Sequence, residues 1–212
     1  MENTPKPLVS VIIPCYNSTE LRRTLESVCK QSYSCWEALC VDDGSDMELF
    51  PVINAINDPR IFYYRLEEHN NANVARNYGI NHSRGEYIAM LDSDDEWLET
   101  HLEDSVSMLL EEKADCIYGS LILRGETDSI FTARPVGEDE TVIDYLLSTG
   151  YGAQTSTLVM TALSAKDILW DETLKRHQDY DFVIRYSRKY KIFPRIKPTV
   201  IYHFSDTPPI ID

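Results

Sequence analysis

The segment "YIAMLDSDDEW" (Tyr87–Trp97) joins a short apolar run to four carboxylates within five residues. The apolar run is too short for a helix, and its abrupt end is typical of a buried strand. Carboxylates this close together repel one another. We therefore expect the strand to end where a metal ion or a ligand supplies an opposite charge, unless solvent alone screens the cluster.

Strand and helix patterns alternate through the first half of the chain. Their order is strand 8–14, helix 21–29, strand 36–46 broken by an Asp-Asp-Gly-Ser turn, strand 61–65, helix 74–82 and the strand that leads into the acidic cluster. Asn17 or Ser18 is the expected N-cap of the first helix. Strands that are apolar on both faces and alternate with helices predict an α/β fold with a mostly parallel sheet flanked by helices.

The second half is less regular. Strands are predicted at 115–123, 130–133, 155–160, 191–195 and 200–203, and helices at 141–147, 163–169 and 179–189. We expect this half to extend the sheet and to form a lobe over its edge. In a parallel sheet, ligands bind outside the carboxyl ends of the strands. Tyr16, Asp43 and Asp92 each follow such an end, so they are expected to line one rim.

Composition bounds the class of protein. The chain has 212 residues, 43% of them apolar, which suits a single soluble domain. It contains no apolar stretch of about 20 residues, and its first residues lack a signal-peptide pattern, so a cytoplasmic location is expected. The five cysteines show no metal spacing and are expected to be reduced thiols. The net charge of −15 argues against a nucleic-acid partner.

Four interpretations of the acidic cluster compete. It could begin a solvated helix, with Thr100 and Glu103 as a capping box. It could be a calcium loop, although Trp97 stands where such a loop needs glycine. It could be a phosphatase-type D-x-D, whose first aspartate is a nucleophile. Finally, Asp92 and Asp94 could hold Mg²⁺ or Mn²⁺ against a diphosphate, since residues two apart in an extended chain point the same way.

Five segments, taken together and in order, resemble the family 2 glycosyltransferases of the GT-A fold. They are "VSVIIPCYN" (9–17), "LESVCKQSY" (25–33), "VDDGSD" (41–46), "ARNYGINHSRGEYIAMLDSDDEW" (75–97) and, more weakly, "RHQDYDFVIRY" (176–186). The resemblance implies one domain over residues 1–212, with a nucleotide-binding half at about 1–97 and an acceptor and catalytic half at about 98–212. It also implies a nucleotide-sugar donor, a UDP-sugar in particular, and transfer to an acceptor hydroxyl with inversion.

The resemblance assigns roles to individual residues of the first half. Pro14 and Tyr16 would border the nucleoside pocket, and Asp43 would accept a hydrogen bond from the base while Asp42 braces the turn. Asp92, with Ser93, would contact the donor ribose or the metal, and Asp94 would be the main ligand of Mn²⁺ or Mg²⁺. Arg76 would lie near the diphosphate or pair with acids of the rim. Asn70 and Asn71 replace a frequent Gly-Gly pair, so a positive φ is expected there.

Roles in the second half rest on the same resemblance. Asp179 is assigned as the general base, with Gln178 where glutamate often stands, and Asp181 is expected to be structural. His203 is a candidate metal ligand. The acceptor would be a saccharide or a lipid-linked saccharide of a bacterial surface polysaccharide, met at the membrane surface where it is lipid-linked. A metal-dependent phosphatase and a non-catalytic sugar-nucleotide-binding domain stay open as alternatives.

Overall fold

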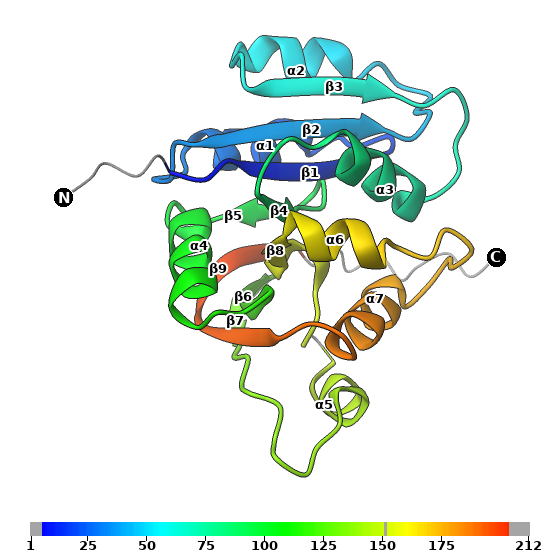
Figure 1. Cartoon of the computed structure of the whole chain (residues 1–212). Coiled ribbons are helices and arrows are strands. Elements are labelled where there is room, and N and C mark those ends of the chain that lie inside the picture. Colours follow the sequence, from blue (N-terminus) through cyan, green and yellow to red (C-terminus); the bar gives the residue numbers. More distant parts are fainter. Residues whose placement is uncertain (1–5, 151, 204–212) are drawn as a thin grey trace.

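The computed structural model describes residues 6–150 and 152–203, which contain a nine-stranded sheet and seven α-helices (Figure 1). The strands are β1 (Val9–Cys15), β2 (Trp36–Asp42), β3 (Ile61–Arg65), β4 (Tyr87–Met90), β5 (Glu96–Trp97), β6 (Cys116–Arg124), β7 (Ser129–Phe131), β8 (Val159–Thr161) and β9 (Ile192–His203). The helices are α1 (Leu21–Cys29), α2 (Phe50–Ile56), α3 (Ala72–His82), α4 (His101–Glu111), α5 (Val142–Thr149), α6 (Ala162–Ile168) and α7 (Gln178–Ser187), and a 3₁₀ turn covers Thr155–Thr157.

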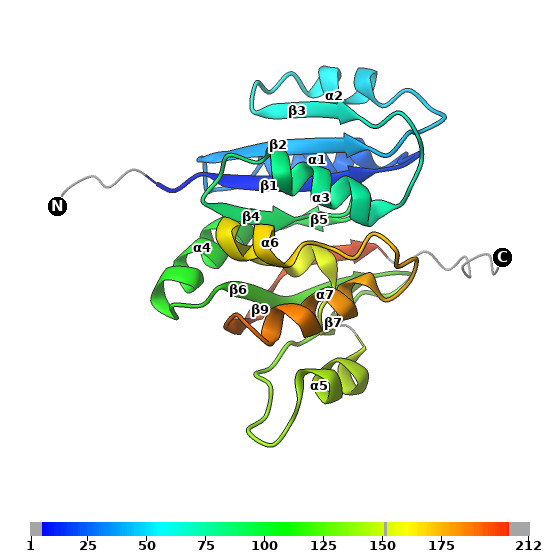
Figure 2. The ribbon, with the colours of Figure 1, turned by 45° about the vertical axis from the view of Figure 1, so that its right-hand side comes forward.

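The strands lie in the order β3-β2-β1-β4-β8-β6-β9-β5, and β7 pairs with the outer part of β6. The first four are mutually parallel, as the alternation of strands and helices predicts. Beyond β4 the sheet is mixed, because β8 runs antiparallel to both β4 and β6 while β6 and β9 are parallel. The second half therefore extends the same sheet, as expected (Figure 2).

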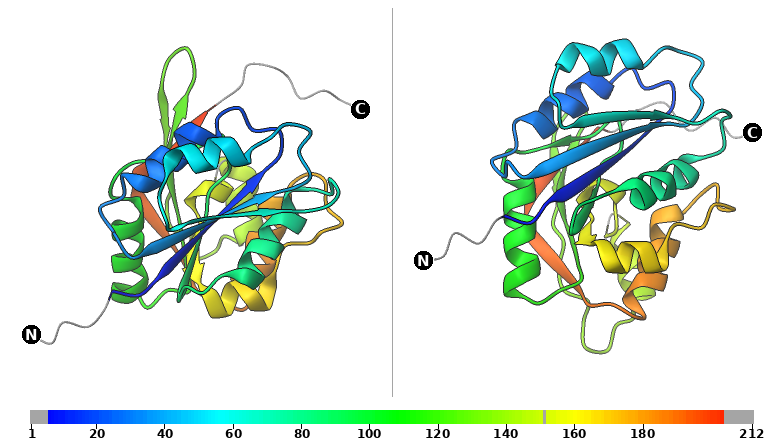
Figure 3. Two further views of the ribbon diagram at one scale, coloured as in Figure 1. Left: turned by 90° about the horizontal axis from the view of Figure 1, so that it is seen from above. Right: turned by 45° about the horizontal axis from the view of Figure 1, so that its top comes forward.

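Helices cover both faces of the sheet (Figure 3). Apolar residues of α1, α2 and α4 pack on one face, and those of α3, α5, α6 and α7 pack on the other. All seven residues of β1 are buried because this strand lies between β2 and β4 with helices above and below. Such burial on both faces explains why residues 9–13 are apolar except for Ser10, whose buried hydroxyl donates to Glu37.

The parallel arrangement fixes the position of the polar residues that follow the strands. In the register of the sheet, Cys15 lies beside Asp42 and Ile12 lies beside Met90. The chain segments that leave β1, β2 and β4 therefore emerge at the same edge. This confirms the expectation that Tyr16, Asp43 and Asp92 share one rim.

Two predicted helix caps are wrong, although α1 begins at residue 21 as expected: its N-cap position is held by Glu20, and Thr100 at the N-cap position of α4 makes no side-chain cap. Ser18 instead bonds to the carbonyl of Ser93, and Glu103 accepts a hydrogen bond from the Ser32 hydroxyl. Side chains that local spacing assigns to helix caps thus form hydrogen bonds with residues far away in the sequence.

The strands predicted at 191–195 and 200–203 are one strand, β9, which crosses Pro198 opposite an irregularity between Gly119 and Leu121 of β6. Among the described residues, no helix is both long enough and apolar enough to cross a bilayer.

Candidate functional site

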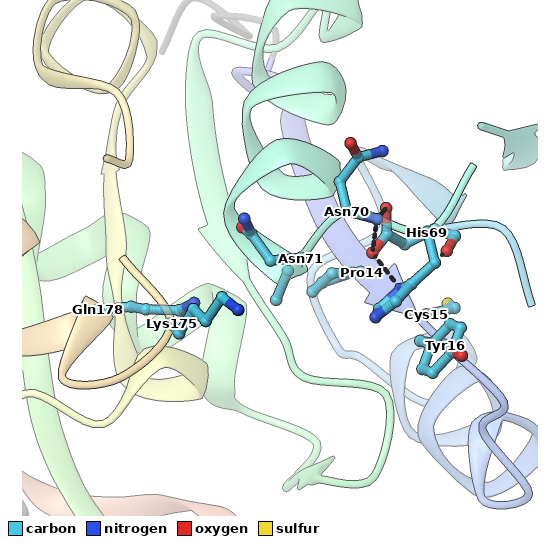
Figure 4. A pocket seen from close by; sticks show the side chains of 10 residues that line it. Pro14, Cys15, Tyr16, His69, Asn70, Asn71, Lys175 and Gln178 are labelled. Atoms are coloured by element: carbon cyan, nitrogen blue, oxygen red, sulfur yellow. Dashed lines mark hydrogen bonds and ion pairs between the residues drawn. The ribbon is translucent and has the colours of Figure 1, made fainter. Parts of the chain in front are cut away.

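A pocket of about 490 Å³ opens at the carboxyl edge of β1 and β2 (Figure 4). Its lining comes from four regions: the end of β1, the turn after β2, the segment that leads from β3 into α3, and the segment that enters α7. The lining residues are Pro14, Cys15, Tyr16, Asp43, His69, Asn70, Asn71, Ala72, Lys175 and Gln178. The pocket therefore joins residues predicted for the donor site with residues of the second half.

Asp43 lines this pocket and is only 2% exposed. Both of its carboxylate oxygens accept from the backbone N–H of Asn70, at 3.1 Å, and Nδ1 of His69 lies 2.8 Å from Oδ2. Burial is the main influence that raises the pKa of Asp43 above its usual range. A carboxylate has about four acceptor positions, so Asp43 can still accept from a ligand.

Aromatic rings lie beside Asp43. The Tyr16 ring is stacked on the His69 ring, with 3.8 Å between the centroids and 19° between the planes. Tyr16 is 43% exposed, so its ring offers a flat apolar surface at the pocket. An aromatic face next to a buried acceptor is suited to a planar ligand that carries an N–H donor, such as a nucleobase.

The turn after β2 is held by Asp42. Its carboxylate accepts from the backbone N–H of Ser45 at 2.8 Å and from the Tyr63 hydroxyl at 2.6 Å, so Asp42 braces the turn as expected. Gly44 lies at φ +71°, and a Cβ there would come within 2.7 Å of the Glu68 backbone. The turn therefore requires glycine, and it places Asp43 toward the pocket.

The segment before α3 differs from expectation. Neither Asn70 nor Asn71 has a positive φ. Asn71 is extended and is the N-cap of α3, where its side chain accepts from the N–H groups of Asn73 and Val74. Asn70 serves the site through its backbone N–H. The two asparagines therefore replace glycines without needing the left-handed conformation.

The acidic cluster divides into separate environments. The chain turns at Ser93 and Asp94, with the N–H of Asp95 bonded to the carbonyl of Asp92. The Ser93 carbonyl accepts from the hydroxyls of Ser18 and Thr24, so α1 and the loop before it hold this turn. The turn replaces the extended geometry expected for Asp92 and Asp94.

Asp95 is turned into the core and is 1% exposed. Its carboxylate accepts from the Gln154 side chain and from the Ser156 hydroxyl, which come from the start of the 3₁₀ turn. Burial, with added repulsion from Asp92, raises the pKa of Asp95 to about 8. Asp95 therefore fixes the turn from below and is not presented to a ligand.

Asp92 and Asp94 are the carboxylates of the cluster that face the rim. Asp94 is exposed and has no side-chain partner among the described residues, and its pKa is raised by desolvation first and by Asp92 next. Two neighbouring oxygen ligands that repel each other fit a Mg²⁺ or Mn²⁺ ion that shares substrate phosphates. The described residues contain no group of three or more acidic, histidine or cysteine side chains arranged so that it could hold a metal ion.

His203 lies close to this cluster but is engaged elsewhere. Its Nε2 is 2.7 Å from Glu96 Oε1, and its backbone N–H donates to Asp95. Glu96 is also 3.3 Å from the Arg23 guanidinium. To bind a metal, His203 would have to exchange its bond to Glu96 or use its other ring nitrogen, so this role stays a prediction.

Arg76 connects the two halves of the site. Its guanidinium donates to Asp92 Oδ1 at 2.8 Å and to Gln178 Oε1 at 3.0 Å, and it lies over the Trp170 ring at 4.5 Å. Of the two expected roles, the structure has Arg76 paired with an acid of the rim. This pairing brings the N-terminus of α7 next to the acidic turn.

Asp179 lies in the first turn of α7, directly after Gln178. Burial raises the pKa of Asp179, and the negative charge of Asp92 raises it further. A raised pKa is what a carboxylate needs to act as a general base near neutral pH. Asp181, in contrast, is paired with Arg185 at 2.7 Å one turn further along the helix, in agreement with a structural role.

Three residues of this site were not singled out by the sequence: His69, Asp95 and Lys175. His69 reaches Asp43 only because the segment after β3 crosses the end of β2, which no local pattern reveals. Asp95 looks equivalent to Asp94 until Gln154 and Ser156 bury it. Lys175 lines the pocket although it is more than 130 residues from Asp43 in the chain.

Fold and site together define a protein of the GT-A fold, with a pocket and a D-x-D pair at the carboxyl edge of the sheet. The chain belongs to glycosyl transferase family 2, whose family model matches residues 10–156. The D-x-D therefore stands in a glycosyltransferase family and not in a phosphatase.

Two curated relatives and one solved structure illustrate the similarity. The chain is 34% identical over 207 residues to the amylovoran biosynthesis glycosyltransferase AmsB of Erwinia amylovora, covering 92% of this chain and 69% of AmsB. It is 40% identical over 115 residues to the UDP-Glc:alpha-D-GlcNAc-diphosphoundecaprenol beta-1,3-glucosyltransferase WfgD of Escherichia coli, covering 53% and 45%. The structure of S. aureus TarS 1–349 in complex with UDP-GlcNAc matches with a TM-score of 0.78 at 22% identity, over 94% of this chain and 59% of that one. Apart from AmsB, these matches span about half to three fifths of the related chains.

Proposed function

We propose that this protein transfers a sugar from a UDP-sugar to an acceptor hydroxyl, with a divalent metal ion and with inversion at the anomeric carbon. One observation carries the proposal: the pocket of Tyr16 and Asp43, the Asp92–Asp94 pair and Asp179 meet at one rim. Arg76 links them, since it bonds both to Asp92 and to the residue before Asp179.

The pocket would bind the nucleoside of the donor. Tyr16 would stack on the base while Asp43 accepts the imide N–H of uracil. Pro14 would border the base, and Ser93 would lie beside the ribose with Asp92. The selectivity of Asp43 follows from its chemistry: held as an acceptor by the N–H of Asn70, it favours bases with an N–H on their pairing edge.

Asp94 and Asp92 would hold Mn²⁺ or Mg²⁺, with His203 as a further candidate ligand. The residues fit this ion because Asp94 has no side-chain partner among the described residues and Arg76 is bonded to Oδ1 of Asp92 but not to Oδ2. The donor phosphates would complete the coordination. When bound, the ion supplies positive charge for the departing diphosphate.

Asp179 would take the proton of the acceptor hydroxyl as that oxygen attacks the anomeric carbon from the face opposite the diphosphate. Its raised pKa suits this step, and its neighbour Gln178 is held by Arg76. Direct displacement by a single base gives inversion at the sugar carbon. Asp181 cannot serve in its place, because Arg185 holds it.

The two halves would divide the work, with residues 1–97 binding the nucleotide and residues 98–212 binding the acceptor and carrying the base. The acceptor is proposed to be a saccharide or a lipid-linked saccharide of a cell-surface polysaccharide, reached by a cytoplasmic protein at the membrane surface. The names of AmsB and WfgD support this class of acceptor. Residues 134–157 are the proposed acceptor segment, of which residue 151 lies outside the described residues.

Nucleotide binding is the first test. Melting temperatures would be measured with UDP, GDP, dTDP, CMP and ADP, each with and without Mn²⁺, for the wild type and for Asp94→Ala. A ligand that binds only the folded state raises the melting temperature. We expect a shift with UDP that needs Mn²⁺ and is lost in Asp94→Ala. The absence of any nucleotide shift in the wild type would refute the donor site.

Turnover is the second test. Release of UDP from UDP-sugars would be compared for the wild type, Asp179→Asn and the matched helix variant Asp181→Asn, and the anomeric configuration of the product would be read by NMR. We expect Asp179→Asn to lose at least 100-fold in kcat while Asp181→Asn keeps its activity. Donor binding without turnover in the wild type would favour the non-catalytic alternative, and hydrolysis of p-nitrophenyl phosphate would favour the phosphatase.

A further inference from the structure

Lys175 lies on the segment between α6 and α7 and lines the same pocket as Tyr16 and Asp43 (Figure 4). The side chain is exposed, and its ammonium group has neither an ion pair nor a hydrogen bond to any described residue. The lysine thus brings an unpaired positive charge from the second half of the chain to a pocket built mainly by the first half.

The backbone around Lys175 is fixed in place. The Asn71 side chain donates to the carbonyl of Glu172 at 2.8 Å, three residues before the lysine. The Gln178 side chain donates to the carbonyl of Leu174 at 2.9 Å, directly before it. Because both bonds involve residues that also line the pocket, the position of Lys175 above the pocket follows from the structure of the rim itself.

The negative charge of the rim indicates that a positively charged side chain is needed there to bind a diphosphate. Asp43, Asp92, Asp94 and Asp179 make the rim strongly acidic, and Arg76, which lies at this rim, is already paired with Asp92. A nucleoside diphosphate adds further negative charge, which a single divalent ion bound to two aspartates only partly offsets. An unpaired ammonium group at the pocket can contact phosphate without first breaking an ion pair.

We propose that Lys175 is a donor-positioning residue that binds the diphosphate of the sugar nucleotide from the side of the second half. This inference rests on the proposed function and adds a residue to it. The lysine would contact the phosphates and not the nucleoside. Its loss should therefore weaken the affinity for UDP and leave the affinity for uridine unchanged. The lysine also stabilises the diphosphate as it leaves.

Isothermal titration with UDP and with uridine, each with Mn²⁺ present, would test the inference on the full chain. The variants are Lys175→Met, Lys175→Arg and the matched control Arg176→Met. Arg176 is the adjacent residue, is also exposed and unpaired among the described residues, and does not line the pocket. We expect Lys175→Met to bind UDP about five- to tenfold more weakly, as for the loss of one charge-assisted phosphate contact.

Uridine affinity should stay unchanged in all three variants, which also verifies that they fold. Lys175→Arg should keep most of the UDP affinity, and raising the salt concentration should narrow the gap between wild type and Lys175→Met. An equal UDP affinity of Lys175→Met and Arg176→Met would overturn the inference while leaving the donor site intact. Failure of the wild type to bind UDP would instead count against the proposed function.

Discussion

His101 is completely buried at the start of α4, and its environment predicts a pH-dependent stability. The ring is stacked on Trp97 with 4.1 Å between centroids, and Nδ1 lies 2.9 Å from the Thr199 hydroxyl. Nε2 has no partner among the described residues. Burial, helped by the positive charge of Arg195, lowers the pKa of His101 well below its usual range.

The sign follows from proton binding in the two states. The unfolded chain takes up a proton on His101 at about pH 6.5, whereas the folded chain keeps the ring neutral. The free energy of unfolding is therefore unaffected by this group above pH 7 and falls as the pH drops below 6.5. At pH 5, which is 1.5 units below that value, the loss is about 2 kcal/mol.

His101→Phe removes this contribution while keeping a ring that can stack on Trp97. Urea unfolding, followed by tryptophan fluorescence, would be measured at pH 7.5 and pH 5.0 for the wild type, His101→Phe and His177→Asn. His177 is exposed, so its variant should lose stability in parallel with the wild type. We expect the wild type to lose about 2 kcal/mol more than His101→Phe over this interval. Equal losses in these two proteins would refute the reasoning.

Three further predictions concern the rim. Gly44→Ala should lower the free energy of unfolding by about 1–3 kcal/mol in the same urea assay, because its φ is +71° and the added Cβ meets the Glu68 backbone. His69→Ala should bind uridine a few fold more tightly in calorimetry, because this ring occupies the stack and the bond that a base would use; weaker binding would mean that His69 packs on the bound base instead. Gln178→Glu adds a negative charge beside Asp179, which raises the pKa of that carboxyl, so the acidic limb of the pH–rate profile should move to higher pH. An unshifted limb would argue against Asp179 as the base.

Strands β1, β2 and β4 were predictable because they are buried almost throughout, whereas the edge strand β3 is only partly buried and was recognisable by its isoleucine and aromatic residues. Residues 61–65 were placed correctly at both ends, and β1, β2 and β4 were placed to within a few residues. Parallel strands covered on both faces leave long apolar runs that need no partner to be recognised. The rim followed from the same information, since it depends only on where parallel strands end.

The second half was harder because its elements depend on distant partners. Residues 192–203 form one strand across Pro198, which local rules take as a break. The strand survives because β6 has a matching irregularity near Gly119, where two segments of different length stay paired. No property of residues 192–203 alone predicts this irregularity.

The acidic cluster at residues 92–96 also combines a feature that the local sequence predicts with one that depends on distant residues. Its position at the end of β4 was predictable, but the separate roles of Asp94 and Asp95 were not. Asp95 is buried by Gln154 and Ser156, which lie about 60 residues further along the chain, while Asp94 stays at the surface beside Asp92. The repulsion noted in the sequence is thus relieved partly by the protein itself, because Asp92 is paired with Arg76 and burial raises the pKa of Asp95 to about 8. Of the four carboxylates in residues 92–96, only that of Asp94 is left without a hydrogen bond or an ion pair to another described side chain.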